Sequence, residues 1–255
     1  MGLNDLISKL TDPYERQARL WPALLALFPL FLMLGLLYAP KMSALKNAVA
    51  LASSCGGLFL LTNVCREWGK RLEPKLYEKW GGKPTTQLLR HRDDTIEGVT
   101  KKRYHAFLAT KIKEPFPDRE QEDRNPIGAD EVYQSAVRWL LNQTRDTKRF
   151  GILFKENITY GFRRNGLAMK PVGVLISISS ILWVLITQGV MNIKGDAIFS
   201  ISALMALSDI KIVSLVTSFV MLFTWIFFFT KNSTRNAAFT YAETLFRACD
   251  ALNNK

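Results

Sequence analysis

Cysteine and histidine are scarce in this chain of 255 residues, which contains three cysteines and two histidines. Cys55, Cys65 and Cys249 are scattered, and their spacing suits neither a disulfide framework nor a zinc site. With only His91 and His105 available, we expect no His/Cys metal site. The sequence therefore predicts a protein without a metal or another cofactor.

Signatures of catalysis are also missing. The chain contains no G-x-S-x-G or H-E-x-x-H motif, and no Cys–His–Asp set can be assembled from it. Asp93 and Asp94 stand beside His91, but adjacent residues of a helix point in different directions, so the two carboxylates would not converge. The sequence predicts that the protein is not an enzyme. A membrane enzyme that uses Asp93 or Asp94 is the least favoured alternative.

Charge is absent from four apolar runs, each about as long as the ~20 residues that a helix needs to cross a bilayer. The runs are Leu20–Ala39, Asn47–Cys65, Pro171–Ile193 and Ile212–Thr230. They predict an all-α membrane protein with four transmembrane helices in two hairpins. A pump or proton-coupled transporter usually needs ionisable groups inside its spans, so active transport is not expected.

The second run is the least hydrophobic, and it is our candidate for a polar pathway through the membrane. Its proposed pore-lining residues are Ser53, Ser54, Gly57, Thr62 and Asn63. Small and hydroxylated residues also let helices approach each other closely, so simple helix packing is the alternative for each of them.

Positive charge is concentrated between the second and third runs. Residues 66–170 hold 23 of the 34 Lys and Arg residues and carry +8 of the net charge of +12. The flanks on the side of this insert and of both termini contain sixteen Lys and Arg residues, against four in the two opposite loops. The positive-inside rule therefore places the insert and both termini in the cytoplasm.

This orientation predicts five parts. They are a cytosolic amphipathic helix at 1–19, a transmembrane hairpin at 20–65, a basic, mainly helical cytosolic domain at 66–170, a second hairpin at 171–230 and a cytosolic C-terminal helix at 231–255. The first run has full length and follows a long charged segment, so we expect a retained anchor rather than a cleavable signal peptide.

Three secondary-structure predictions concern the insert. Its start continues the helix of the second run, and residues 118–129 are polar and form a loop. Asp130 caps a helix from Glu131 to about Arg149. The third span starts cleanly after Pro171.

The segment W-G-G-K-P-T-T-Q-L-L-R-H-R-D-D begins at Trp80. Two glycines free its backbone, and Thr85 or Thr86 can cap a following helix whose N–H groups, with Lys83, would bind a phosphate. It is not a Walker A loop, because Tyr77 stands where the first glycine should be. A Gly-Gly turn followed by a capped helix is the simpler interpretation.

Basic residues also recur in the predicted Glu131–Arg149 helix. Arg138, Arg145 and Arg149 lie three or four residues apart together with Asn142, and therefore on one helical face. Such arginines, with nearby aromatic rings, suit a nucleotide. One alternative stays open for this helix: Arg138 and Arg145 could pair with carboxylates such as Asp93, Asp94 or Asp146.

A third basic group follows at Arg163, Arg164 and Lys170, after Tyr160 and Phe162. Its residues are also typical of the positive flank of a membrane span, where they would contact lipid head groups. For this group the lipid interpretation is favoured.

The fragments W-G-G-K-P-T-T…L-L-R-H-R-D-D, A-V-R-W-L-L…Q-T-R-D-T-K-R-F and Y-G-F-R-R-N-G…K-P cover roughly Trp80–Pro171. With the four-span layout, they resemble membrane effectors of bacterial anti-phage systems, and most nearly the channel-forming effector of the Hailong system. The resemblance implies a tetramer in the bacterial inner membrane. A short single-stranded DNA, made by a separately encoded nucleotidyltransferase, would hold it closed.

The same resemblance implies a shared role in binding phosphates for six residues: Lys83, Arg90, Arg92, Arg138, Arg145 and Arg149. Together, sequence and resemblance predict a homo-oligomeric channel or membrane-disrupting effector that a nucleotide or oligonucleotide gates. The alternative is a non-conducting membrane scaffold whose basic domain binds acidic lipids or an acidic protein.

Overall fold

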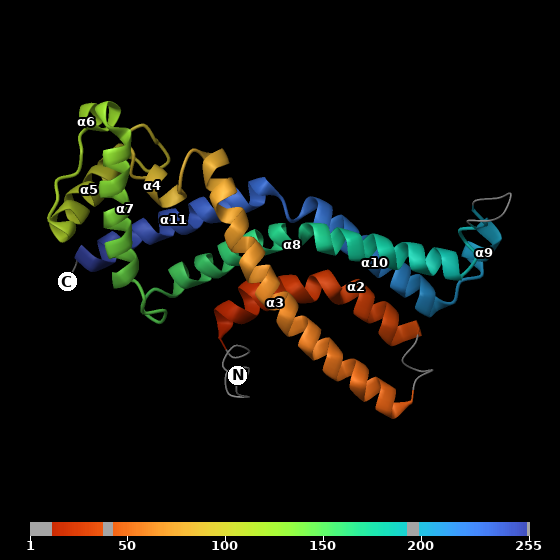
Figure 1. The fold of residues 1–255 in the computed structure, drawn as a ribbon. Helices are drawn as coiled ribbons and strands as arrows, with labels where there is room; N and C mark the ends of the chain where they lie inside the picture. Colours follow the sequence, from red (N-terminus) through yellow and green to blue (C-terminus); the bar gives the residue numbers. More distant parts are fainter. Residues whose placement is uncertain (1–11, 38–42, 193–198, 254–255) are drawn as a thin grey trace. The chain divides into compact units, whose positions relative to one another are not determined.

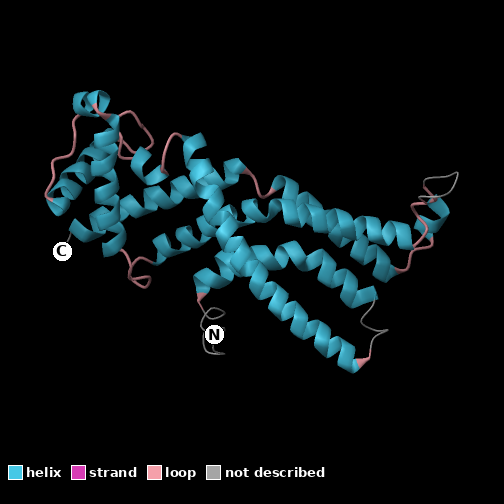
Figure 2. Cartoon of the chain, in the orientation of Figure 1, coloured by secondary structure: helices cyan, strands magenta, loops and turns pink. Residues whose placement is uncertain are grey.

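The computed structural model describes residues 12–37, 43–192 and 199–253. Helices make up 81% of the structure, and the described residues form no strand (Figure 2). The all-α prediction is confirmed. The first helix is η1 (Glu15–Leu20). The helices labelled in Figure 1 are α2 (Trp21–Leu37), α3 (Ala44–Trp80), α4 (Pro84–Gln87), α5 (Gly98–Ile112), α6 (Arg119–Arg124), α7 (Pro126–Gln143), α8 (Gly151–Thr187), α9 (Ile201–Met205), α10 (Asp209–Phe227) and α11 (Lys231–Asn253).

The chain folds into two compact units. Unit 1 comprises Met1–Leu72 and Gly161–Lys231, and unit 2 comprises Glu73–Tyr160 and Asn232–Lys255. The boundary falls within the long helices α3 and α8, and most of the C-terminal helix α11 belongs to unit 2. The predicted N-terminal amphipathic helix lies largely outside the described residues.

Unit 1 contains the apolar helices. Three segments are long and apolar enough to cross a membrane: Glu15–Leu37, Gly151–Thr187 and Asp209–Phe227. They suggest a membrane-embedded protein. The second apolar run lies in α3, where many side chains fall outside the described set, so the four-span layout stays a prediction.

The end of α3 and the start of α8 can be compared with the boundaries predicted from the sequence. Helix α3 continues without a break to Trp80, which confirms that the insert begins as an extension of the second run. The third span was predicted to start after Pro171, and the structure shows that the helix which contains it, α8, begins earlier, at Gly151, and passes through this proline. Neighbouring helices can satisfy the carbonyl that a membrane proline frees.

Close approach through glycine holds the apolar helices of unit 1 together. Helix α10 packs against α2. A Cβ atom added to Gly173 of α8 would lie 2.1 Å from a ring atom of Trp225, and one added to Gly166 would lie 2.0 Å from the ring of Phe229. Both rings are completely buried, so the two glycines provide the space that they fill.

Unit 2 has a separate core, formed mainly by α5, α7 and α11. Tyr133 and Leu140 of α7 are fully buried there, with Leu108 of α5 and with Leu245 and Phe246 of α11. The buried residues of α7 form one apolar stripe, because residues three and four apart on one helix share a face.

The structure corrects two predictions near α7. The residues Asp118–Ala129 are not all loop: Asp118 and Gln121 form a capping box that begins α6. Helix α7 does not run from Glu131 to Arg149. It begins at Pro126, because the Asn125 side chain accepts a hydrogen bond from the Gly128 N–H, and it ends at Gln143.

A polar cluster lies beneath the segment that joins α4 to α5. The Glu122 carboxylate is 5% exposed and accepts hydrogen bonds from the Tyr133 hydroxyl at 2.7 Å and the His91 backbone N–H at 2.9 Å. The Lys101 ammonium, equally buried, donates to the Arg90 carbonyl at 2.8 Å and also to the Asp93 carbonyl. These contacts satisfy charged groups whose burial would otherwise be costly.

Replacement of Gly173 by alanine should destabilise unit 1, because the added methyl group overlaps the Trp225 ring; such overpacking costs about 1–3 kcal/mol. Thermal unfolding of the full chain in detergent, followed by circular dichroism, should show a midpoint lowered by several degrees. Gly35→Ala is the matched control, since a Cβ atom there meets nothing within 4 Å. Equal midpoints for the two variants would contradict this packing.

Acid should destabilise unit 2 through His105. Burial lowers the pKa of His105 from 6.5 to about 4, with further lowering by His91 and Lys101, while its bond to the Leu89 carbonyl and the Glu122 charge act in the opposite direction. Between these two values the unfolded chain binds a proton that the folded chain does not. Stability therefore falls as the pH drops from 6.5 to about 4, by about 3 kcal/mol at most.

His105→Gln keeps a side-chain N–H donor for the Leu89 carbonyl but does not titrate in this range. We expect its unfolding midpoint to fall less than that of the wild type between pH 6.5 and pH 4.5. Parallel curves for the two proteins would show that His105 does not set this dependence.

Candidate functional site

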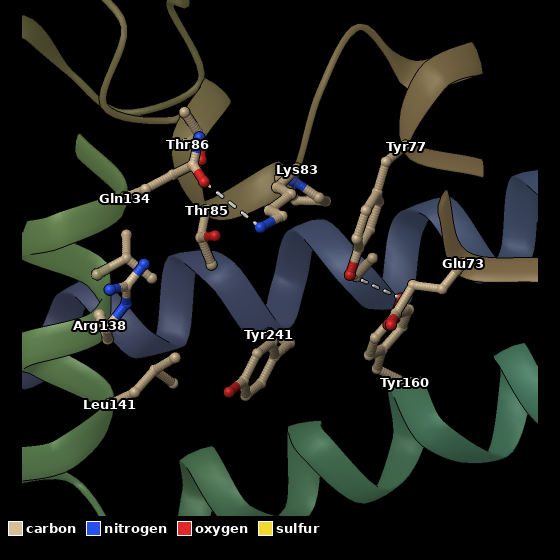
Figure 3. A pocket seen from close by; sticks show the side chains of 13 residues that line it. Glu73, Tyr77, Lys83, Thr85, Thr86, Gln134, Arg138, Leu141, Tyr160 and Tyr241 are labelled. Atoms are coloured by element: carbon tan, nitrogen blue, oxygen red, sulfur yellow. Dashed lines mark hydrogen bonds between the residues drawn. The ribbon is translucent and has the colours of Figure 1, made fainter. Parts of the chain in front are cut away.

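A cavity of about 350 Å³ opens in unit 2 between the end of α3, the start of α4, α7, the start of α8 and α11 (Figure 3). Its size lies at the lower end of the range of small-molecule sites. Its polar side chains are cationic, acidic or hydroxyl-bearing, apart from the amide of Gln134. Lys83 and Arg138 contribute cationic groups, while Glu73, Tyr77 and Tyr160 contribute a carboxylate and hydroxyl groups.

Lys83 reaches the cavity from a Gly-Gly turn. Gly81 and Gly82 have φ values of +86° and +132°, which side chains other than glycine rarely tolerate. Lys83 is the N-cap residue of α4 and its ammonium group lies 3.5 Å from the Gln134 side-chain oxygen. The turn thus directs Lys83 toward α7.

Thr85 and Thr86 do not cap the following helix as the sequence suggested. Helix α4 has only four residues, Pro84 occupies its first turn, and no side chain caps it. The backbone N–H groups of Thr86 and Gln87 already donate to the Lys83 carbonyl. The structure therefore offers side chains, rather than a helix start, for anion binding.

Arg138 is the second cation of the cavity. It is exposed on α7, one helical turn after Gln134, and forms no ion pair within the described part of the chain. The suggested pairing of Arg138 with a carboxylate is therefore not found there. Lys83 and Arg138 are the two predicted phosphate-binding residues that this cavity brings together.

Arg90 has a structural role instead. Its guanidinium group forms a bidentate ion pair with Asp130 at 2.8 and 2.6 Å and donates to the Gly81 carbonyl at 2.8 Å. The hydrogen bond to Asp130 raises the pKa of Arg90 further. Since Asp130 lies inside α7, this carboxylate anchors an arginine rather than capping the helix. We therefore leave Arg90 out of the proposed phosphate-binding set.

Arg92, Arg145 and Arg149 do not line this cavity. Arg145 and Arg149 follow the end of α7, so the prediction that they share a helical face with Arg138 is wrong. Arg145 donates to the Asn142 side chain, Arg149 donates to the Ala251 carbonyl, and Arg92 is exposed.

The sequence analysis missed the aromatic part of the cavity. Tyr77, Tyr160 and Tyr241 come from three different helices, and Glu73 lies one turn before Tyr77 on α3. The Tyr160 hydroxyl donates to the Glu73 carboxylate at 2.7 Å. The sequence did contain a signal for Tyr160, because this residue begins the aromatic and basic Y-G-F-R-R-N fragment. No local sequence pattern indicated a role for Tyr77 or Tyr241.

A second cavity of about 390 Å³ adjoins the first in unit 2. The two cavities share Tyr77, Lys83, Thr86 and Gln134 as common lining residues. Thr86 is 2% exposed, and its hydroxyl has no hydrogen-bond partner within the described residues. A buried hydroxyl left unpaired is costly, and a ligand could satisfy it.

The predicted pore residues lie in unit 1. The side chains of Ser53 and Ser54 are outside the described set, and Gly57 is exposed. Thr62 and Asn63 are half-buried, and the Asn63 amide donates to the Phe59 carbonyl of its own helix at 3.2 Å. That these residues line a pore stays a prediction.

Other buried hydroxyl groups of unit 1 escaped the sequence analysis. They belong to Ser177, Ser180, Ser214 and Ser218, on α8 and α10. Ser177 and Ser218 each donate to the carbonyl four residues earlier. Their spacing of three or four residues within each helix was visible in the sequence and is typical of close helix packing.

Removal of Arg90 should destabilise unit 2, because it leaves the Asp130 carboxylate without its two charged hydrogen bonds. We expect Arg90→Ala to cost about 2–3 kcal/mol. The exposed Arg92→Ala should change the free energy of unfolding by less than about 0.5 kcal/mol. Chemical unfolding of the full chain in detergent measures both, and an undisturbed Arg90→Ala variant would refute the structural role.

We compared the chain with protein-family models, with curated proteins and with solved structures, and none of the three comparisons finds a match. The resemblance to the Hailong effector therefore stays a prediction based on the fragments quoted above.

Proposed function

We propose that the protein is a homo-oligomeric membrane channel or membrane-disrupting effector, gated by an anionic nucleotide or oligonucleotide bound to unit 2. The cavity lined by Lys83, Arg138 and three tyrosines carries this proposal. Lys83 and Arg138 form no salt bridge within the described residues, so their charge is available to a ligand. Cationic groups next to aromatic rings suit a phosphate joined to a base.

The adjoining cavity extends the proposal to an oligonucleotide. Lys83 and Thr86 lie in the wall that the two cavities share. Two consecutive nucleotide units could therefore occupy neighbouring cavities, with Lys83 beside the phosphate that links them. A lysine ammonium group has three donors and suits such a bridging position.

The apolar helices support the membrane part of the proposal. Three helices of sufficient length and hydropathy suggest a membrane-embedded protein. The four apolar runs contain no charged residue, which favours a passive pathway over a pump. Ligand binding would change the population of open assemblies only if the two states bind the ligand with different affinity.

The resemblance supplies the biological setting of the proposal. It implies anti-phage defence, a tetramer in the bacterial inner membrane with both termini in the cytoplasm, and a separately encoded nucleotidyltransferase that makes the ligand. A non-conducting scaffold is the second candidate. Exposed cations outside the cavity favour it, such as Arg92 and Lys102, which could contact acidic lipids or an acidic protein.

The full chain in liposomes tests the proposal. We expect a short single-stranded oligodeoxynucleotide or a nucleoside monophosphate to change ion flux at least several-fold. The double variant Lys83→Ala/Arg138→Ala should lose this response, because it removes both cations from the cavity. Arg145→Ala should keep it, since Arg145 lies outside the cavity.

Two outcomes would contradict the gated channel. Flux that no nucleotide changes would favour the scaffold. An equal loss of response in Arg145→Ala would show that net charge, rather than the cavity, determines binding.

A further inference from the structure

The two ends of the 350 Å³ cavity differ in hydrogen-bonding character. Figure 3 shows Arg138 on one side of the cavity and Glu73 with Tyr160 on the opposite side, and Tyr241 lies between them. A ligand that fills the cavity therefore meets different chemistry at each end.

The cationic end offers donors. Lysine and arginine side chains have only N–H donors, three on an ammonium group and five on a guanidinium group. The Gln134 side-chain oxygen occupies one donor direction of Lys83, and Arg138 makes no ion pair within the described residues. The group that binds here must accept hydrogen bonds and carry negative charge, as a phosphate does.

The opposite end offers acceptors. The single hydroxyl proton of Tyr160 goes to Glu73. The Tyr77 and Tyr160 hydroxyl oxygens are 3.2 Å apart. The Glu73 carboxylate lines the cavity, and an ionised carboxylate only accepts hydrogen bonds, at about four lone-pair sites. The group that binds here must donate.

A flat ring fits between the two ends. The rings of Tyr160 and Tyr241 are nearly parallel, with an interplanar angle of 12° and centroids 6.4 Å apart. Aromatic side chains bind nucleobases by stacking, which contributes about 1–3 kcal/mol for a base. The volume of about 350 Å³ suits one nucleotide unit.

Resting on the proposed function, we infer that this cavity reads the base of its nucleotide: Glu73 accepts a hydrogen bond from an exocyclic amino group while Lys83 and Arg138 bind the phosphate. Adenine and guanine carry such an amino group. Uracil and thymine instead place carbonyl oxygens on both sides of their one ring N–H donor. The carboxylate would repel these oxygens, so the cavity discriminates against uracil and thymine.

Binding of AMP, GMP, UMP and inorganic phosphate to the purified full chain in detergent tests the inference, by isothermal titration calorimetry. We expect AMP and GMP to bind at least about tenfold more tightly than UMP, since hydrogen bonds to a charged acceptor contribute at that level. Inorganic phosphate should bind more weakly than either purine nucleotide, because it leaves the tyrosine end empty.

Glu73→Gln provides the sharpest variant. The amide oxygen can still accept from Tyr160, while its N–H group can donate to a carbonyl of uracil. The ratio of AMP to UMP affinity should therefore fall to about one. Glu67→Gln removes the same charge from the same helix and lines neither cavity, so it should keep the wild-type ratio.

The outcomes separate this inference from the proposed function. If AMP, GMP and UMP all bind tightly and with equal affinity, the cavity does not discriminate between bases and the inference is overturned. If this binding is also lost in Lys83→Ala/Arg138→Ala, the proposed nucleotide site is retained. A ratio unchanged in Glu73→Gln would also overturn it. The absence of any nucleotide binding by the folded wild type would overturn the site itself and the inference with it.

Discussion

The ion pair between Arg90 and Asp130 is the constraint on which the candidate site depends. It joins the segment after α4 to the middle of α7, and its third hydrogen bond holds the Gly81 carbonyl. A Cβ atom on Gly82 would lie 2.9 Å from the guanidinium group, so the turn has to contain glycine there. With turn and helix fixed against each other, Lys83 is held beside α7 and Arg138 lies on the same cavity. The pair therefore shapes the 350 Å³ cavity without lining it, whereas it does line the adjoining cavity.

The two units are stabilised by different physics. Unit 2 buries charged groups and satisfies each with hydrogen bonds, as Glu122 and Lys101 show. Such a network fixes loop geometry in advance, so a ligand would not spend its binding energy on ordering the cavity. Unit 1 instead uses glycine and serine to bring apolar helices together. Between helices in lipid there is no hydrophobic driving force, and close van der Waals packing takes its place.

Much of the fold was predictable from local patterns. The apolar runs, the extension of the second run into α3 and the C-terminal helix follow from periodicity and composition. Errors arose at α7, where Asn125 rather than Asp130 begins the helix and where it ends at Gln143. Both residues are good caps, but Asn125 precedes a proline, which suits the first position of a helix, and Asp130 pairs with Arg90 instead. Lys83 and Arg138 were anticipated as cations, but their common cavity was not.

The sequence by itself determined that apolar helices and a basic, helix-rich region would form, since run length, charge and helical period are properties of neighbouring residues. Only the tertiary structure decided which cations a ligand can reach. Arg90 forms an ion pair with a carboxylate forty positions away, whereas Arg138 forms no ion pair within the described residues. It also decided that Tyr77, Tyr160 and Tyr241 meet, because these rings come from three helices whose packing no local pattern specifies. Long-range packing thus converts an unremarkable set of basic and aromatic residues into a site with two chemically distinct ends.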